Sequence, residues 1–180
     1  MKNDAHFLAE PVTDQDHALG PPDAAITIVE YGDYECPDCL NAVPLVHELR
    51  EQLGDRLRFV FRHFPKSSIH PHASAAAEAA EAASDQGKFW EMHESLFRHQ
   101  KELADIDLAH LALTTGLEIY QFEASRSREK HRQRVTADFN GGVRSGVAST
   151  PTFFVNGRRY DGPIDAKAII ATALAAPTRP

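Results

Sequence analysis

The chain has 180 residues, of which 42% are hydrophobic and 25% are charged, and its formal net charge is −7. This composition argues against a disordered chain and a membrane-embedded one, and the excess of acidic side chains argues against a surface that binds nucleic acid. The length predicts one domain with a full hydrophobic core, because no linker divides the sequence.

Residues 1–24 form a polar stretch that contains Pro11, Pro21 and Pro22. This composition predicts an extended or loosely docked lead-in rather than a core element. Residues 1–20 also lack the basic segment and the apolar run of a secretory signal, and no later run approaches transmembrane length. We therefore expect a soluble, cytoplasmic protein, and leave open an exported mature form.

A strand followed by a helix is predicted next. Residues 26–31 are rich in β-branched and aromatic side chains, and their near-continuous apolarity, interrupted by Glu30, is typical of an interior strand. From Leu40, apolar residues recur at helical spacing as far as Leu53, and Gly54 is suited to end that helix. The strand and the helix therefore flank a short loop over residues 32–39.

Proline then marks two further positions. Pro44 lies inside the predicted helix and is expected to remove one backbone hydrogen bond and kink it. Residues 57–64 have the alternation of a strand, which Pro65 closes. A strand, a helix and a strand in this order imply a parallel crossover unit.

A long helical region separates this unit from the rest of the sheet. Its segments combine strong helix formers with apolar residues at helical spacing. The predicted helices cover residues 73–84, 88–100, 108–114, 119–125 and 129–144. Because no linker marks either border, we interpret residues 67–146 as a helical insertion within one domain, whose other parts are residues 25–66 and 147–176.

The sheet is predicted to resume near the end of the chain. Residues 152–155 and 158–160 flank Asn156-Gly157, a strong signal for an antiparallel hairpin. A helix over residues 165–175 follows, and Pro177 and Pro180 end the chain. The order βαβ, helices, ββα predicts an α/β fold with a mixed central sheet and an all-helical insertion.

Both cysteines of the chain lie in the tetrapeptide Cys36-Pro37-Asp38-Cys39, between the first strand and the first helix. A helix N-terminus offers unpaired N–H groups and a positive dipole end, which favour a thiolate. Pro37 fits the first helical turn, where its missing N–H costs nothing. This placement favours thiol–disulfide chemistry.

Metal binding is the main alternative for the two thiols. Zinc needs four ligands, and no second C-x-x-C exists. Two of four histidines could in principle complete a Cys₂His₂ set, namely two of His70, His72, His93 and His99. Their positions at a helix start and on an amphipathic helix are more typical of solvated or capping side chains, so a redox role is favoured over a metal site.

The order of elements, with a C-x-x-C at the first strand-to-helix junction, resembles the thioredoxin fold, and the helical insertion is similar to that of the DsbA family of disulfide oxidoreductases. Four local segments carry the resemblance. They are Glu30 to Cys36, Phe61 to Pro65, Gly87 to Trp90, and Gly146 to Gly157, the last of which is similar to the loop with that fold's cis-proline.

The resemblance implies roles for individual residues. Cys36 would be the nucleophile and Cys39 the resolving thiol, which also follows from the position of Cys36 at the helix N-terminus. Thr150 and Pro151 would form the substrate-binding cis-proline loop, which stands opposite the dithiol. Glu30 would exchange a proton with Cys39, and its burial should raise its pKa.

The pair between the cysteines, Pro37 and Asp38, is expected to tune the redox potential. Oxidising members of the family commonly carry histidine where this chain has Asp38. A carboxylate about one turn from Cys36 should disfavour the thiolate and raise its pKa. We therefore expect a dithiol that is more reducing than those of its strongly oxidising relatives.

The function expected from the sequence is exchange of disulfides with protein or peptide substrates, without a metal or an organic cofactor. The partners would be such a substrate and a reductant such as glutathione or a thioredoxin-type protein, and the chain is expected to be a monomer. Two alternatives remain open: a non-catalytic module that binds a metal or a peptide, and a glutathione-dependent transferase of related fold.

Overall fold

The computed structural model describes residues 7–175, and within them one mixed sheet forms the centre of the molecule. Its strand order is β1-β3-β2-β4-β5, with β2 and β3 parallel and the other neighbours antiparallel. The strands are β1 (His17–Leu19), β2 (Ile26–Gly32), β3 (Leu57–His63), β4 (Thr152–Val155) and β5 (Arg158–Arg159). The mixed α/β sheet expected from the sequence is thus confirmed.

Helix α1 (Pro37–Leu53) links the two parallel strands and begins three residues before the apolar periodicity does. Pro37 occupies its first turn, and Pro44 lies inside it, as predicted. Gly54 follows the helix with a φ of +53°, a backbone conformation that glycine adopts without strain, and it opens the short 3₁₀ helix η1 (Gly54–Arg56).

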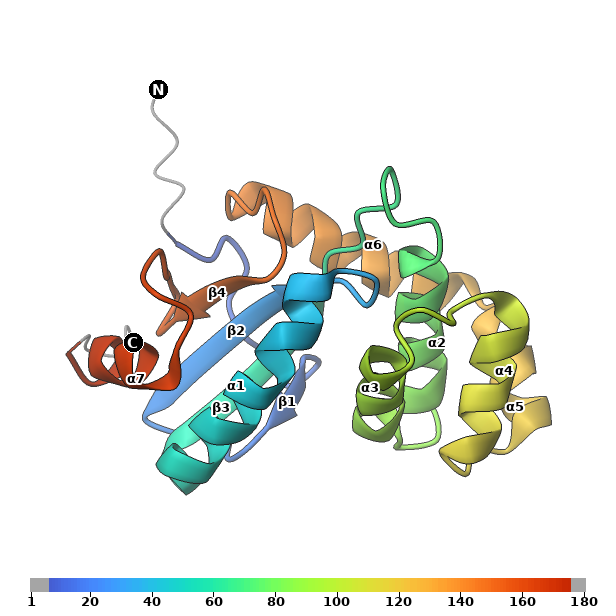
Figure 1. Cartoon of the computed structure of the whole chain (residues 1–180), viewed down its shortest axis with the longest axis horizontal. Helices are drawn as coiled ribbons and strands as arrows, with labels where there is room; N and C mark the ends of the chain where they lie inside the picture. The colour runs from blue at the N-terminus through green and yellow to red at the C-terminus, as the bar shows by residue number, and fades with distance from the viewer. Residues whose placement is uncertain (1–6, 176–180) are drawn as a thin grey trace.

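The remaining helices agree with the predicted segments to within a few residues. Their bounds are α2 (Ala73–Ser84), α3 (Phe89–Arg98), α4 (Asp105–Thr114), α5 (Ile119–Arg126), α6 (Glu129–Arg144) and α7 (Ala166–Ala175). In Figure 1, α2 to α5 form a bundle beside the sheet, α1 crosses in front of it, and α7 lies at the opposite end. Side chains of α2 and α3 share one hydrophobic core with β2 and β3, so the bundle and the sheet belong to one domain.

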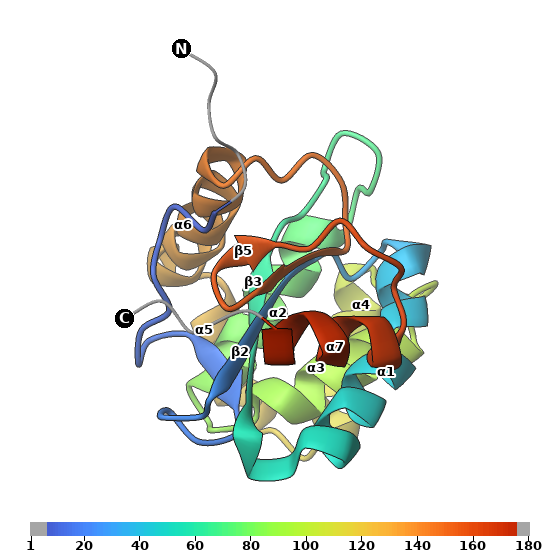
Figure 2. The same cartoon turned by 90° about the vertical axis from the view of Figure 1, so that its left-hand side faces the viewer.

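The sheet is covered on both faces (Figure 2). On one face, the larger apolar core contains Ile28, Phe59 and Phe61 together with side chains of α1, α2, α3 and α7. On the other face, a smaller cluster around Tyr31 and Phe154 packs against α6 and the N-terminal segment. Burial on both faces explains the nearly continuous apolar sequence of β2.

The N-terminal lead-in is more ordered than the sequence predicted. Instead of lying loosely outside the core, it contributes β1, which pairs antiparallel with the free edge of β3. Just before this strand, the Asp16 carboxylate accepts hydrogen bonds of 2.8 and 3.1 Å from the guanidinium of Arg62. The extended alternative agrees with this strand, and the loosely docked alternative is wrong because the buried ion pair and the pairing with β3 hold the segment in place.

Parts of three predictions lie outside the described residues: residues 1–6 of the lead-in, residue 176 of the domain part 147–176, and the end of the chain at Pro177 and Pro180. Within the described part of the chain, no helix combines the length and the apolarity that a membrane crossing requires.

Candidate active site

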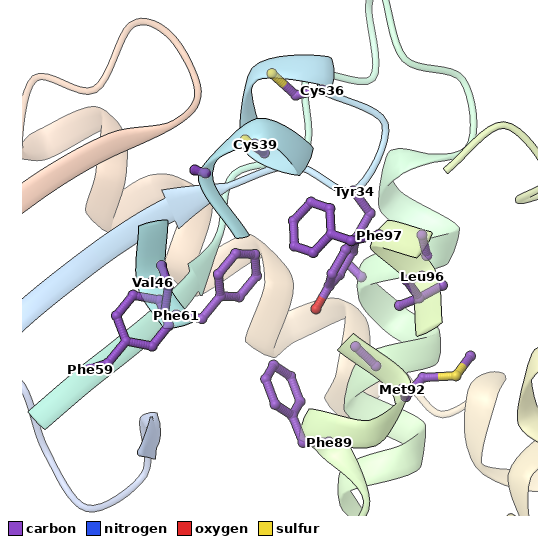
Figure 3. Close-up of a cluster of buried hydrophobic side chains, with 14 of the residues drawn as sticks. Tyr34, Cys36, Cys39, Val46, Phe59, Phe61, Phe89, Met92, Leu96 and Phe97 are labelled. Atoms are coloured by element: carbon purple, nitrogen blue, oxygen red, sulfur yellow. The ribbon is translucent and has the colours of Figure 1, made fainter. Parts of the chain in front are cut away.

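The two cysteines lie at the junction between strand β2 and helix α1. Cys36 occupies the position before the helix and is 7% exposed, whereas Cys39 lies in the first turn and is fully buried. Figure 3 shows both at the upper edge of an aromatic cluster that includes Tyr34, Phe61 and Phe97. Both are free thiols in the structure. Solvent and a substrate can therefore reach Cys36 before they reach Cys39.

The surroundings of Cys36 stabilise its thiolate. A hydrogen bond from the Cys39 thiol is the largest contribution, and the Thr150 side chain and the backbone N–H groups of Asp38 and Cys39 add to it against the effect of burial. Together they lower the pKa of Cys36 to about 5. The helix N-terminus thus acts on the sulfur as the sequence predicted.

The loop before β4 stands opposite Cys36. Its Thr150–Pro151 peptide bond is cis. The Cys36 thiol donates a hydrogen bond of 3.2 Å to the carbonyl oxygen of Thr150. In the described part of the chain, the hydroxyl of Thr150 is buried and has no other partner, so it is available to donate to the thiolate of Cys36. The fold therefore brings these two segments, 114 residues apart, into contact.

Cys39 has the opposite environment. Burial and the hydrogen bond to Cys36 raise its pKa far above that of a free thiol, and the nearby charges of Glu30 and Cys36 add to the effect. The backbone N–H of Asp33 approaches its sulfur at 3.5 Å. At neutral pH, Cys39 is thus a protonated thiol beside the thiolate of Cys36.

Glu30 lies on β2 beneath the dithiol and is 4% exposed. Burial, followed by the charge of Cys36, raises its pKa to about 8, as its place on an interior strand suggested. The carboxyl group lines a small cavity of about 20 Å³, together with His93 and Glu94. Such a cavity has room for a single water molecule. Glu30 can therefore hold or release a proton near neutral pH.

Asp38 is exposed on the first turn of α1. Its backbone N–H is among the groups that lower the pKa of Cys36. Because that pKa is low overall, any opposing effect of the Asp38 carboxylate is outweighed by the hydrogen bonds to the sulfur.

Residues that the sequence did not single out hold the active-site loop in place. The carboxylate of Asp33 accepts hydrogen bonds from the backbone N–H of Glu35 at 2.8 Å, the backbone N–H of Lys66 at 2.8 Å, and Nδ1 of His70 at 2.8 Å. Asp33 is thereby tied to the loop after β3. Its position two residues before Glu35, in an Asx-turn pattern, was the only local signal for this role.

Gln100 supplies a second support from the helical insertion. Its side-chain amide donates hydrogen bonds to the carbonyl oxygens of Tyr34 at 2.9 Å and Cys36 at 2.8 Å. A glutamine just beyond a helix end gives no sequence signal for such a contact. The insertion therefore fixes the backbone on which the nucleophile sits.

The histidines considered as zinc ligands are engaged elsewhere. His93 is buried and lies 3.0 Å from the hydroxyl of Tyr34, so the expectation of a solvated or capping side chain was wrong for it. The cause is the aromatic cluster around it, where burial lowers its pKa to about 3. His70 pairs with Asp33 instead.

A comparison with family models supplies the family. Residues 12–172 match the model described as thioredoxin, which covers nearly the whole described chain. The chain belongs to the thioredoxin family. This thioredoxin-family chain has the DsbA-like form of the fold, with the helical insertion between the parts of the sheet that the sequence predicted.

Curated relatives of this thioredoxin-family chain are longer proteins named as sodium/proton antiporters. It is 45% identical over 163 residues to Na(+)/H(+) antiporter NhaA 1 of Salinispora arenicola, covering 91% of this chain and 25% of that protein. It is also 45% identical over 166 residues to an NhaA 1 of Mycobacterium sp. (strain KMS), covering 91% of this chain and 27% of that protein. The chain thus spans about a quarter of the length of these relatives.

Solved structures share its fold. A thioredoxin-like oxidoreductase from Silicibacter pomeroyi superimposes with a TM-score of 0.81 at 24% identity, covering 91% of this chain and 95% of that one. BdbD from Bacillus subtilis gives a TM-score of 0.77 at 25% identity, covering 94% and 97%. The thiol-disulfide exchange protein alpha-DsbA2 from Wolbachia pipientis gives 0.79 at 19% identity, covering 89% and 86%.

Proposed function

We propose that this chain is a thiol–disulfide oxidoreductase that exchanges disulfides with protein or peptide substrates. The observation that carries the proposal is the asymmetry of the dithiol. Cys36 has a pKa of about 5 and is the more exposed of the two, whereas the pKa of the buried Cys39 is raised. Only a thiolate attacks a disulfide, so the pair has a defined order of action.

In the reducing direction, the Cys36 thiolate attacks one sulfur of the substrate disulfide. A mixed disulfide forms, and the other substrate sulfur leaves as a thiolate. Cys39 then gives its proton to the ionised carboxylate of Glu30 and attacks the sulfur of Cys36, which forms the Cys36–Cys39 disulfide and breaks the mixed disulfide. The substrate sulfur that was bonded to Cys36 leaves as a thiolate, and two electrons have passed from the dithiol to the substrate. The reverse sequence oxidises a substrate dithiol.

The substrate would bind along the Thr150–Pro151 loop. The Thr150 carbonyl oxygen faces Cys36, and β4 begins just beyond this loop. An extended segment of a substrate that pairs with the backbone here would place its sulfur beside the nucleophile. We propose glutathione or a thioredoxin-type protein as the redox partner that restores the dithiol.

The activity is tested by the dithiothreitol-dependent reduction of insulin, followed by turbidity. The wild-type protein should accelerate precipitation of the insulin B chain, and Cys36→Ser should abolish the acceleration because no thiolate is left to attack. Equal rates for wild type and Cys36→Ser would refute the proposal.

The finer proposal concerns the redox potential. We propose that the carboxylate of Asp38 makes this dithiol more reducing than it would be with histidine at that position. Asp38→His should raise the redox potential of the dithiol, because a protonated histidine favours the reduced form, which contains the Cys36 thiolate. Each tenfold change in the equilibrium constant with glutathione corresponds to roughly 30 mV. Equilibration with glutathione buffers measures this potential.

Asp38→Asn separates charge from shape in the same assay. It should shift the potential in the same direction as Asp38→His, but by less. A lower potential in Asp38→His than in wild type would rule out the electrostatic account.

The relatives' name does not extend to this chain, because the chain corresponds to about a quarter of each antiporter. We therefore propose disulfide exchange for this chain rather than ion transport.

A further inference from the structure

A second group of chemically competent side chains lies away from the dithiol. Nε2 of His17 and Nε2 of His63 approach the same carboxylate oxygen of Glu81, Oε1, at 2.8 and 2.9 Å. The three potential ligand atoms lie within 4.8 Å of one another. In the described part of the chain, this is the one group of three or more His, Cys, Asp or Glu side chains with such spacing.

The three residues come from three separate elements. His17 is on β1, His63 ends β3, and Glu81 is on α2. The side chains of His63 and Glu81 are 1% and 6% exposed, and that of His17 is 17% exposed. The group thus lies where the lead-in, the sheet and the helical insertion meet, and it keeps one side open to solvent.

Its charge is not balanced by the neighbouring cations. The buried carboxylates of Asp16 and Asp138 face the guanidinium groups of Arg62 and Arg134, with which they form ion pairs. Among the residues that the structure describes, the partners of the Glu81 carboxylate are the imidazoles of His17 and His63. A buried carboxylate requires a positive counter-charge, which here is either a proton on an imidazole or a bound cation.

The orientation of both rings suits a ligand role. The ring of His17 stacks on Phe89, with centroids 3.5 Å apart and planes 7° apart, which fixes its direction. Nδ1 of His63 is buried and has no hydrogen-bond partner within residues 7–175, so Nε2 is the nitrogen through which this ring makes its polar contact there. Two imidazole nitrogens and one carboxylate oxygen are a known zinc donor set, with a fourth position left to water.

We propose that His17, His63 and Glu81 form a binding site for a divalent transition metal of the zinc class. Zinc ligands stand about 2.0–2.2 Å from the ion, so the three donor atoms need to separate by only a few tenths of an ångström. The bound ion would join β1, β3 and α2 and supply the missing counter-charge to Glu81. This proposal is independent of the disulfide chemistry.

Titration with Co²⁺ and Zn²⁺ tests the site in a protein without a histidine tag, with Cys36 and Cys39 first oxidised to a disulfide so that thiols cannot bind the metal. Visible absorption of Co²⁺ and calorimetry with Zn²⁺ should each show one equivalent per chain. Binding should weaken at least tenfold in His63→Gln and in Glu81→Gln, because each change removes one ligand.

His47→Gln is the matched control, because His47 forms a similar pair with Glu94 at 2.8 Å on the surface, and it should bind the metal like wild type. His17→Gln is a further ligand variant. Because the His17 side chain is partly exposed, this change should disturb folding less than His63→Gln, and it tests the site even if His63→Gln does not fold. The absence of a single stoichiometric site in wild type, or equal binding by His17→Gln and wild type, would mean that these residues form a hydrogen-bonded triad only.

Discussion

At the scale of single residues, the fold gives two neighbouring thiols opposite properties. A hydrogen bond from the Cys39 thiol, followed by the side chain of Thr150 and the backbone N–H groups of the first helical turn, favours a thiolate on Cys36, while burial keeps the proton on Cys39. The difference does not come from the cysteines themselves, which have the same intrinsic chemistry. The difference in pKa comes from their positions, because Cys36 precedes the helix and Cys39 is buried in its first turn.

The thiolate of Cys36 can be measured directly. Absorbance at 240 nm of the reduced protein should rise with a midpoint near pH 5, and Cys36→Ser should lack this transition. Thr150→Val should move the midpoint upward, because it removes a hydroxyl that stabilises the thiolate. Thr114→Val, which removes a hydroxyl bonded to a helix carbonyl elsewhere, should leave it unchanged. A wild-type midpoint near pH 8 or 9 would contradict the proposed stabilisation.

Glu30 makes stability depend on pH. Its pKa rises from 4.5 to about 8 on folding, so the native state binds the proton more tightly. The free energy of unfolding should therefore fall as pH increases from 4.5 to 8. Glu30→Gln should remove this decline and stabilise the protein above pH 8 by up to about 5 kcal/mol.

Urea unfolding of the oxidised protein at pH 4 and pH 9 tests the direction of this change, because the disulfide removes the titration of Cys36. The charge of the Cys36 thiolate is then absent, so the effect in the oxidised protein reports the larger contribution to the Glu30 pKa, which is burial, and should be smaller than in the reduced protein. Glu51→Gln, a change at an exposed residue of α1, serves as the control and should have the same pH dependence as wild type. An equal effect of Glu30→Gln at both pH values would show that the carboxyl group is not perturbed.

At the scale of elements, the helical insertion and the loop after β3 act as supports for the active-site loop. Gln100 donates to the carbonyl oxygens of Tyr34 and Cys36, and Asp33 ties the loop to Lys66 and His70. The backbone before α1 is thus held from two sides, which keeps the N–H groups of the first turn directed at Cys36.

Gln100→Ala should weaken this support. The loss of two hydrogen bonds should lower the free energy of unfolding by about 1–2 kcal/mol and slow the attack by Cys36 on a small disulfide. Gln52→Ala removes an exposed glutamine whose side-chain amide donates to the carboxylate of Glu48 at 2.8 Å, away from the active-site loop, and it should change neither quantity. A Gln100→Ala protein with wild-type stability and rate would assign no supporting role to this residue.

The elements themselves were largely predictable because strong local signals mark their ends. Gly54, Pro65 and the Asn156-Gly157 pair each stand at the end of an element, and burial on both faces makes β2 continuously apolar. Strand β1 gave no such signal. It has three residues in a polar stretch, and its pairing depends on an ion pair with a residue 46 positions away.

The same distinction holds for the candidate site. Cys36, Cys39 and the Thr150–Pro151 loop were identified from motif and resemblance, and the structure brings them together. Gln100 and the group of His17 and His63 were not, because contacts between distant segments leave no local pattern. Burial of His93 likewise depends on aromatic neighbours that come from several elements.

At the scale of the whole molecule, buried charge pairs connect the lead-in to the sheet and the helical insertion. The hydrogen bonds of Arg62 hold the pKa of Asp16 below its usual value, although burial alone would raise it. Arg62 also donates to the carbonyl oxygens of Glu10 and Pro11, and Arg134 of α6 lies 3.6 Å from Asp16. Loss of the contacts between Arg62 and the lead-in should therefore release the lead-in from the sheet.

Asp16→Asn should destabilise the protein by about 3 kcal/mol at pH 7, because it leaves a buried guanidinium without its anion. The folded pKa of Asp16 is lowered, so this contribution is present at neutral pH and is lost as the pH falls below the usual value of 3.8. Denaturant unfolding at pH 7 and pH 3 measures both effects.

Asp14→Asn is the matched control, because Asp14 is 98% exposed and lies 3.9 Å from Arg58, and little change is expected from it. Equal stabilities of Asp16→Asn and Asp14→Asn at pH 7 would show that the lead-in does not depend on the buried pair.

Trapping of the mixed disulfide tests the central claim most directly, namely that Cys36 attacks and Cys39 resolves. Reduced Cys39→Ser and Cys36→Ser proteins are incubated with a disulfide-bonded peptide at pH 7, quenched with acid and analysed by intact mass. We predict that Cys39→Ser accumulates a covalent peptide adduct at Cys36, while Cys36→Ser forms little or none. An adduct on Cys39 in Cys36→Ser, formed as fast as the adduct on Cys36, would contradict the account.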